Sequence, residues 1–123
     1  MFRMLLSLSS MLGCLGVVLG AFGAHFLKQK ISLESLAVFE VGVRYQMYHV
    51  FAIFVSAWGF AQFQDQLFGY AAWLFVVGIL LFSGSLYLIA LFGLRYLGII
   101  TPIGGLCFVV GWICLMFGFF KNN

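Results

Sequence analysis

A polar cluster of six side chains that could do chemistry interrupts an otherwise apolar chain. Its members are His25, Glu40, Arg44, Tyr45, Tyr48 and His49. Glu40 and Arg44 are four residues apart, which is the spacing of a favourable ion pair on a helix. Ionisable groups at membrane depth are costly and suggest function by default, so this polar cluster is the candidate site. No nucleophile constellation or nucleotide-binding loop accompanies it, so the sequence specifies no reaction.

The same residues also have a purely structural interpretation. Glu40 and Arg44 would cost little if they lie among lipid headgroups, and tyrosines are common in the aromatic belt of membrane proteins. Either histidine could simply form a hydrogen bond with a backbone carbonyl across the bundle. Both interpretations depend on how the surrounding elements place these side chains.

Composition indicates that the solvent of this chain is lipid. Of its 123 residues, 65% are hydrophobic and 7% are charged, whereas a soluble domain carries about 25% charged residues. A chain this short cannot hide so much apolar surface in a water-soluble core, because small domains have a high ratio of surface to volume. The formal net charge of +3 comes from scattered basic residues, which do not form the basic stripe that holds nucleic acid. We therefore expect contact with a lipid bilayer and no nucleic-acid partner.

The three cysteines, Cys14, Cys107 and Cys114, all lie inside apolar runs. They make neither a disulfide framework nor the spacing of a metal site. We interpret them as small packing residues, and we predict no metal and no resident cofactor.

Four segments are long and apolar enough for membrane-spanning helices, which need about 20 mostly apolar residues. They cover about residues 4–27, 38–60, 69–92 and 97–120. Backbone groups in lipid must be paired internally, so helices are the expected structure at these lengths. The sequence predicts an all-α polytopic membrane protein, a tightly packed four-helix bundle forming one domain over residues 1–123. The first segment resembles a signal peptide, but its length and its one-sided glycines favour a retained helix.

The second and fourth segments have unusual features. Ser32 is a reasonable N-cap for one helix over residues 33–60, and that helix would be about 42 Å long, beyond the roughly 30 Å of hydrocarbon. Its lipid-buried part would then start near Tyr45. Pro102 interrupts the fourth segment. Either the helix is kinked there or it starts at Thr101 with the proline in its first turn, and we favour the kink.

Small residues recur on one face of every predicted helix. The glycines of this pattern are Gly13, Gly16, Gly20, Gly23, Gly104, Gly111 and Gly118. Small side chains let helix backbones approach closely in lipid, where the hydrophobic drive between helices is weak. We therefore expect these glycines at helix–helix contacts and no wide pore in one subunit.

His49 is the residue of the polar cluster that this pattern places inside the bundle. It shares a face of the second helix with Tyr45, Ala52 and Ser56. His25 ends the first helix, so if the first two helices are antiparallel neighbours we expect both histidines near the same membrane face. We also expect Trp112 in the core, with its N–H bonded to a partner such as a serine of the third helix.

Five short motifs, "GAFGAH", "RYQMYH", "SGSLY", "TPIGG" and "GW", begin at residues 20, 44, 83, 101 and 111. Together they resemble a widespread family of small membrane proteins, domain of unknown function 423, whose bacterial members are called YgdD-like. The first two motifs are specific, and the resemblance covers nearly the whole chain. It implies a four-helix protein of the bacterial inner membrane with no established activity. It makes the positions of His25 and His49 part of the family pattern and assigns them no role.

Three functions are compatible with these observations. The first is a non-enzymatic packing, accessory or assembly component of the inner membrane, which packs against itself or a larger membrane complex. The second is a redox protein that binds haem through the two histidines or holds a quinone in an aromatic groove. The third is a proton or small-solute pathway through an oligomer, which would require a continuous polar lining.

Basic residues near the helix ends give a prediction of orientation. Lys28, Lys30 and Arg95 lie on one side, while Arg3 and Lys121 lie on the other. Short loops with more lysine and arginine tend to stay in the cytoplasm. We therefore expect residues 28–37 in the cytoplasm and both termini outside.

Overall fold

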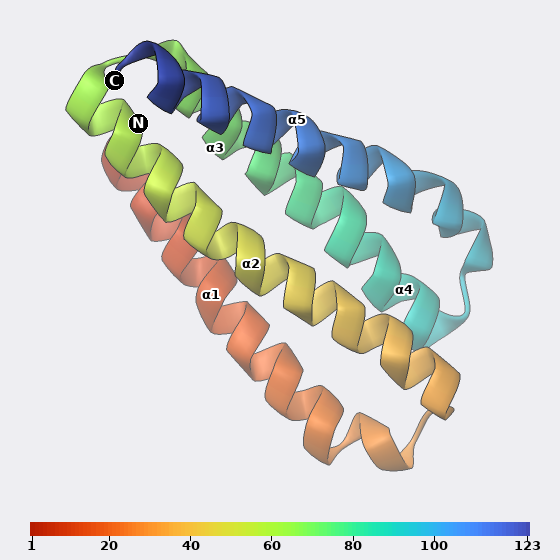
Figure 1. Cartoon of the computed structure of the whole chain (residues 1–123). Helices are drawn as coiled ribbons and strands as arrows, with labels where there is room; N and C mark the ends of the chain where they lie inside the picture. Colours follow the sequence, from red (N-terminus) through yellow and green to blue (C-terminus); the bar gives the residue numbers. More distant parts are fainter.

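The computed structural model describes all 123 residues, and helices joined by short turns account for nearly the whole chain (Figure 1). In order these are α1 (Phe2–His25), η1 (Leu27–Gln29), α2 (Leu33–Phe63), α3 (Gln66–Gly78), η2 (Ile79–Ser83), α4 (Gly84–Phe92), η3 (Arg95–Ile99) and α5 (Ile100–Lys121). The π-helical η2 joins α3 and α4 into one continuous rod, and the 3₁₀ segment η3 leads directly into α5. The chain is thus an all-α bundle of four rods.

Three of the four rods are long and apolar enough to cross a membrane by length and composition, namely residues 2–29, 66–92 and 95–121. The fourth rod, α2, is the longest, with 31 residues, or about 46 Å at 1.5 Å per residue. It is less apolar than the others because it carries Gln46, His49 and Ser56, whose side chains are all buried against other helices. These three polar residues therefore face protein, as expected for a membrane protein.

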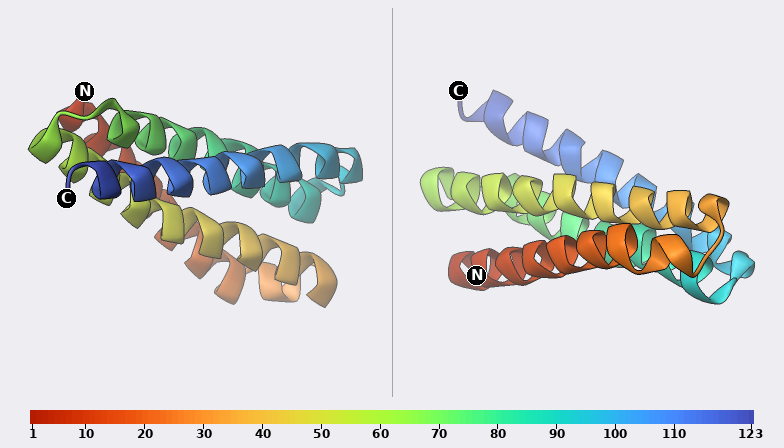
Figure 2. Two further views of the ribbon diagram at one scale, coloured as in Figure 1. Left: turned by 45° about the horizontal axis from the view of Figure 1, so that its top comes forward. Right: turned by 90° about the horizontal axis from the view of Figure 1, so that it is seen from below.

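The rods are arranged as antiparallel neighbours, with α2 between α1 and the α3–α4 rod. Figure 1 shows the order α1, α2, α3–α4 and α5 across the molecule, and Figure 2 shows both chain termini together at one end. The main core lies toward that end and is built around Leu5, Ile53, Phe68 and Phe75, all with no exposed surface. A second, smaller core around Phe39 closes the other end of the bundle.

The start of α2 and the start of α5 show which local predictions hold. Ser32 is the N-cap of α2, because its Oγ accepts a hydrogen bond from the N–H of Ser35 at 3.1 Å. The preference for a kink at Pro102 is wrong. The helix α5 begins at Ile100, so Pro102 lies in its first turn, where a missing N–H costs no intrahelical bond.

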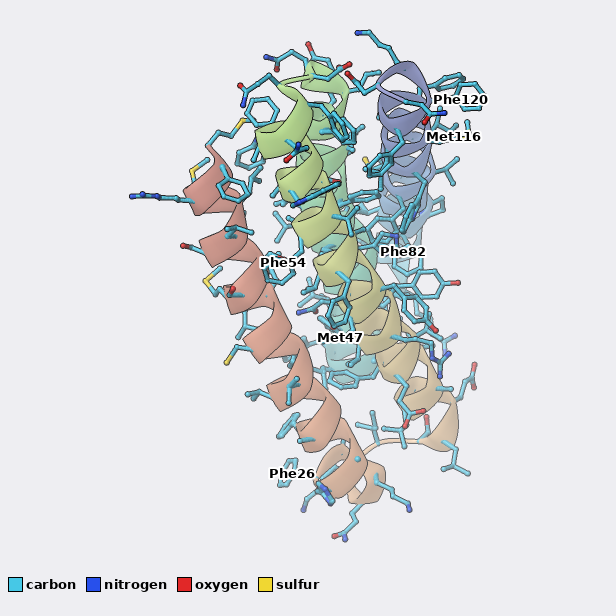
Figure 3. All side chains as sticks on the ribbon, turned by 60° about the vertical axis from the view of Figure 1, so that its left-hand side comes forward. Phe26, Met47, Phe54, Phe82, Met116 and Phe120 are labelled. Carbon is cyan, nitrogen blue, oxygen red and sulfur yellow. The ribbon has the colours of Figure 1, made fainter.

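The predicted glycine contacts exist on both the first and the last helix. A Cβ on Gly23 would lie 2.9 Å from the ring of Phe39, and one on Gly16 would overlap Met47, which lies between α1 and α2 (Figure 3). A Cβ on Gly13 would lie 3.4 Å from Val50, and one on Gly20 would lie 3.4 Å from Val43, so these two positions are less crowded. On α5, added Cβ atoms would press on the ring of Phe75 at Gly111 and on the ring of Phe68 at Gly118.

Gly104 makes the closest backbone approach of the bundle. A Cβ there would overlap the backbone N of Phe82 and lie 2.8 Å from its Cα. Phe82 belongs to the π-helical η2. Gly78 lies just before that segment, and a Cβ added to it would lie 3.2 Å from the carbonyl oxygen of Gly104. The α3–α4 rod and α5 therefore touch backbone to backbone, and glycine is required at that crossing.

Candidate functional site

His49 is the buried centre of the polar residues, with 4% of its surface exposed. Its Nδ1 is 2.6 Å from the carbonyl oxygen of Tyr45, one turn earlier on α2. Its Nε2 is 3.1 Å from Nε1 of Trp112 on α5. An indole N–H can only donate, so Nε2 is the acceptor and the proton of the neutral ring lies on Nδ1. Both ring nitrogens are therefore engaged.

Aromatic rings hold the imidazole of His49 in one plane. The ring of Phe108 stacks on it with a centroid distance of 3.5 Å and an interplanar angle of 6°. Phe75 lies at 5.5 Å and Trp112 at 5.9 Å on other sides. Such packing fixes the side-chain rotamer, so the two hydrogen bonds have little freedom to rearrange.

Gln46 is a second buried polar junction, one turn before His49 and 3% exposed. Its Nε2 donates to the carbonyl oxygen of Leu12 on α1 at 2.7 Å. Its Oε1 accepts the hydroxyl of Tyr87 on α4 at 2.6 Å. One side chain of α2 thus connects α1, α2 and α4.

Two buried serines add bonds to the backbone of α2. Ser9 of α1 donates to the carbonyl oxygen of Val50 at 2.8 Å, and Ser83 of η2 donates to that of Gly42 at 2.6 Å. Together with the bonds of Gln46 and His49, these contacts connect α2 to every other rod. We call the α2 groups that make these bonds the polar hub, consisting of Gln46, His49 and the carbonyl oxygens of Gly42 and Val50. No buried side-chain nitrogen or oxygen in the chain lacks a partner.

The six residues of the predicted polar cluster do not come together as one site. Only His49 is buried, while His25, Glu40 and Arg44 are exposed. Glu40 and Arg44 form no ion pair. Tyr45 and Tyr48 are 38% and 54% exposed, on the side of α2 that faces α5.

The expected proximity of His25 and His49 is also wrong. Gly23, close to His25, faces Phe39, whereas Gly13 faces Val50, the neighbour of His49. These two levels are ten residues apart on α1, which corresponds to about 15 Å along the helix. The end of α1 lies beside the start of the buried face of α2, at Phe39, so His25 marks the helix terminus and lies far from the level of His49.

An open groove lies beside His49 between α2 and α5. It has a volume of about 370 Å³ and is lined largely by aromatic rings. The rings belong to Tyr45, Tyr48, His49, Phe82, Phe108 and Trp112. Trp112, expected in the core, is instead 47% exposed at this groove. Its N–H partner is His49 of α2 and not a serine of the third helix, because α5 meets α2 at this level.

Sequence reasoning missed Gln46, although a signal for it exists. The face of α2 chosen from the sequence ran through Tyr45, but the most buried face runs through Gly42, Gln46, His49, Ile53 and Ser56. These residues are spaced four and three apart, as expected for one face of a packed helix. The small-residue pattern directed attention to the adjacent face.

Asp65 forms a clamp outside the membrane-spanning segments, at the same end of the bundle as the two chain termini. Its Oδ1 accepts the N–H of Leu67 at 3.0 Å, and its Oδ2 contacts Nδ2 of Asn122 at 2.9 Å and Nζ of Lys121 at 3.0 Å. The Leu67 N–H, followed by the Asn122 amide and the Lys121 ammonium, lowers the pKa of the Asp65 carboxyl to about 2. The clamp thereby caps α3 and fastens the end of α5 to it.

The fold and the buried polar bonds define the class of this molecule, a small polytopic α-helical membrane protein. A family model described as "Protein of unknown function (DUF423)" matches residues 19–105. The chain therefore belongs to the DUF423 family, as its motifs suggested. The specific motifs at residues 20–25 and 44–49 lie on α1 and α2, the two helices that Gln46 and Ser9 connect.

Relatives of known sequence are membrane proteins of similar length. The UPF0382 membrane protein SSP2132 of Staphylococcus saprophyticus is 41% identical over 120 residues, covering 97% of this chain and 98% of that protein. The UPF0382 membrane protein YwdK of Bacillus subtilis is 45% identical over 107 residues, covering 83% and 84%. The UPF0382 inner membrane protein YgdD of Escherichia coli is 34% identical over 116 residues, covering 94% and 88%. No solved structure matches the chain.

Proposed function

We propose that this protein is a non-enzymatic structural component of the bacterial inner membrane, a rigid bundle that packs against itself or a larger membrane complex. The observation that carries this proposal is the polar hub of α2. Gln46, Ser9 and Ser83 hold helices together through their hydrogen bonds, and both nitrogens of His49 are engaged. The inner membrane is favoured because one relative, YgdD, is named an inner membrane protein.

The arrangement of the histidines disfavours haem ligation. A histidine that ligates haem needs a free ring nitrogen, and His49 would have to give up its bond to Trp112 or to the Tyr45 carbonyl. His25 is exposed at the end of α1, about 15 Å away along the helix, so the two rings cannot face each other across one macrocycle.

The serines and Gln46 likewise disfavour a pathway for protons or solutes through one subunit. The side chains of Ser9, Gln46 and Ser83 each donate a hydrogen bond to a backbone carbonyl oxygen of a neighbouring helix. The core between this level and the termini is built from Phe68, Phe75 and other fully buried apolar residues. A continuous polar lining is therefore interrupted by close-packed rings.

One observation favours a second candidate function, the binding of a flat amphiphile such as a quinone. The groove between α2 and α5 is open on one side, has a volume of about 370 Å³, and is lined by the rings of Tyr45, Tyr48 and Trp112. Aromatic side chains pack well against flat rings. We rank this second, because the one buried polar side chain at the groove, His49, already has two partners.

The function is tested on protein purified in mild detergent. The proposal predicts no Soret band and no quinone in an organic extract at a stoichiometric level. A stoichiometric haem would overturn it, and a stoichiometric quinone would establish the second candidate instead. Tyr48→Leu is the matched control for the quinone, because Tyr48 lines the groove and makes no hydrogen bond to the rest of the bundle. A quinone bound in the groove should be lost in this variant while the fold is kept.

We propose further that residues 28–37 lie in the cytoplasm and both termini outside. Lys28, Lys30 and Arg95 on one side outnumber Arg3 and Lys121 on the other, which supports this orientation by the positive-inside bias. A C-terminal reporter that is active only in the cytoplasm should be silent. Strong reporter activity would reverse the orientation.

A further inference from the structure

The outward face of α2 carries a continuous row of exposed side chains, which we call the α2 seam. It consists of Glu40, Arg44, Tyr48, Phe51, Val55 and Trp58. From Arg44 onward the spacing alternates between four and three residues, which is the spacing of the contact positions in a coiled coil. The four apolar members are between 42% and 63% exposed. Tyr48 and Trp58 border α5, through the groove and through Phe119, and no helix of this chain covers the row from the outside.

The charged end of the α2 seam lies at the edge of the hydrocarbon. Val43 faces Gly20, and α1 continues five residues beyond Gly20, or about 8 Å. The 24 residues of α1 span about 36 Å against roughly 30 Å of hydrocarbon. If α1 is centred in the bilayer, Val43 lies about 5 Å and Arg44 about 7 Å inside the hydrocarbon, and Glu40 lies near its boundary.

Neither charge of the seam has a partner within the chain. Glu40 and Arg44 are exposed and do not pair with each other, and the one ion pair of the structure joins Lys121 and Asp65 at the opposite end. Charged side chains in a membrane usually pair with one another or face protein. The seam therefore presents an unpaired carboxylate at Glu40 and an unpaired guanidinium at Arg44. A complementary partner would place a basic group opposite Glu40 and an acidic group opposite Arg44.

We propose that the occupant is a second copy of this chain, packed α2 against α2 about a two-fold axis along the membrane normal. In this arrangement Glu40 faces Arg44 of the partner subunit, and Arg44 faces Glu40 of the partner subunit. The two residues are four apart, an axial offset of about 6 Å, and parallel coiled coils form similar interhelical ion pairs between residues five apart. The seam is thus complementary to its own two-fold image, as an isologous interface requires.

The apolar part of the seam completes this interface. Phe51, Val55 and Trp58 would each lie against their counterparts in the partner subunit, where aromatic rings pack favourably. Lipid chains could also cover these residues, but they would leave Arg44 without a carboxylate. This inference rests on the proposed structural function and specifies one of its partners, namely the protein itself.

Disulfide cross-linking in native membranes tests the interface. The background replaces Cys14, Cys107 and Cys114 with alanine, and a single cysteine is then introduced by Phe51→Cys or, as the matched control, by Val18→Cys. Val18 is 57% exposed on α1 and lies off the seam. We expect Phe51→Cys to form cross-linked dimers and Val18→Cys to remain monomeric. Equal cross-linking at both positions, or none at Phe51, would overturn the proposal.

Charge exchange then tests the register. Glu40→Arg or Arg44→Glu alone, in the Phe51→Cys background, turns both attractive contacts into repulsive ones. Dimer yield should fall by about tenfold or more, since like charges across an interface are strongly disfavoured. Co-expression of the Glu40→Arg chain with the Arg44→Glu chain, under different tags, restores opposite charges only between the two subunits, and the mixed dimer should form as efficiently as the unmodified one.

The charge variants separate this proposal from its alternatives. If lipid phosphate is the partner of Arg44, Glu40→Arg will leave the dimer yield unchanged, and that result overturns the interface. A mixed dimer that forms no better than either variant alone also overturns it. Glu40→Arg and Arg44→Glu should both keep the melting temperature of the parent in detergent. A lower dimer yield then cannot be caused by misfolding. Stoichiometric haem would overturn the proposed function whatever the cross-linking result, whereas failed cross-linking without a cofactor removes only the self-association.

Discussion

The indole N–H of Trp112 on α5 donates to Nε2 of His49 on α2 at 3.1 Å, while Nδ1 of the same ring binds the Tyr45 carbonyl oxygen. This pair connects α2 and α5 through His49, a residue that the sequence presented as a possible catalytic or ligating group. The geometry makes His49 a bridge between helices. The polar hub of α2 therefore explains why a membrane helix carries a histidine and a glutamine in its buried half.

Replacement of the indole should weaken the bundle. Trp112→Phe keeps most of the ring packing on His49 and removes the N–H, so it should lower the free energy of unfolding by about 0.5–1.5 kcal/mol, the range of interhelical hydrogen bonds in membranes. Unfolding in a titration with a denaturing detergent measures the change. Trp73→Phe is the control, because Trp73 is 38% exposed and makes no side-chain hydrogen bond; an equal loss in both variants would contradict the role of the N–H.

The Gln46 junction should be more sensitive, because two partners depend on it, the Leu12 carbonyl oxygen and the hydroxyl of the half-buried Tyr87. Gln46→Leu leaves the Tyr87 hydroxyl without its acceptor, and an unpaired buried polar group costs about 1–3 kcal/mol. Adding Tyr87→Phe removes the orphaned hydroxyl and should recover part of the loss. Thermal melting in detergent tests both steps, with the exposed Gln62→Leu as the neutral reference. No recovery in the double variant would mean that Tyr87 does not depend on Gln46.

The crossing between α5 and the α3–α4 rod should not tolerate a methyl group. In Gly104→Ala the new Cβ overlaps the backbone N of Phe82, and overpacking of this kind costs about 1–3 kcal/mol. Gly84→Ala is the matched control, because nothing lies within 4 Å of the added Cβ. That variant should be neutral or stabilising by up to about 1 kcal/mol through helix propensity. Similar melting temperatures for the two variants would refute the close crossing.

The Asp65 clamp should make stability depend on pH. The pKa of this carboxyl is lowered to about 2 in the folded protein, so its contribution is complete above the ordinary pKa near 3.8 and is lost as the pH falls toward about 2. Asp65→Asn keeps an oxygen that can cap α3 and removes the charge. The melting temperature of the parent should fall more than that of Asp65→Asn between about pH 4 and pH 2; parallel curves would show that the clamp does not form.

Much of the fold follows from the sequence because membrane helices are specified by length, apolarity and small residues. The helices, the Ser32 cap and the contacts of Gly16, Gly23, Gly104 and Gly111 were all predictable in this way. The place of Pro102 in the first turn of α5 was not, because a proline is compatible both with a bend inside a helix and with a first turn, and only the position of η3 decides between them.

The site was less predictable, because its bonds join residues far apart in the chain. His49 could be placed inside the bundle from its helical face, but its partner Trp112 is 63 residues away. Ser9 and Ser83 bond to backbone carbonyl oxygens, which leave no signal in a side-chain pattern. The expected meeting of His25 with His49 failed because α2 is already buried at Phe39, opposite Gly23, while His49 lies ten residues further along, next to Val50 opposite Gly13.

A double-mutant cycle on His49 and Trp112 measures the bridge most directly. His49→Phe, Trp112→Phe and the combined variant are unfolded under the same conditions, and the loss in the combined variant is compared with the sum of the two single losses. If the two side chains hold α2 and α5 together by their hydrogen bond, the combined loss falls short of the sum by about 0.5–1.5 kcal/mol. Losses that add to within about 0.3 kcal/mol would show that His49 and Trp112 are not coupled, and the structural role of His49 would then have no support.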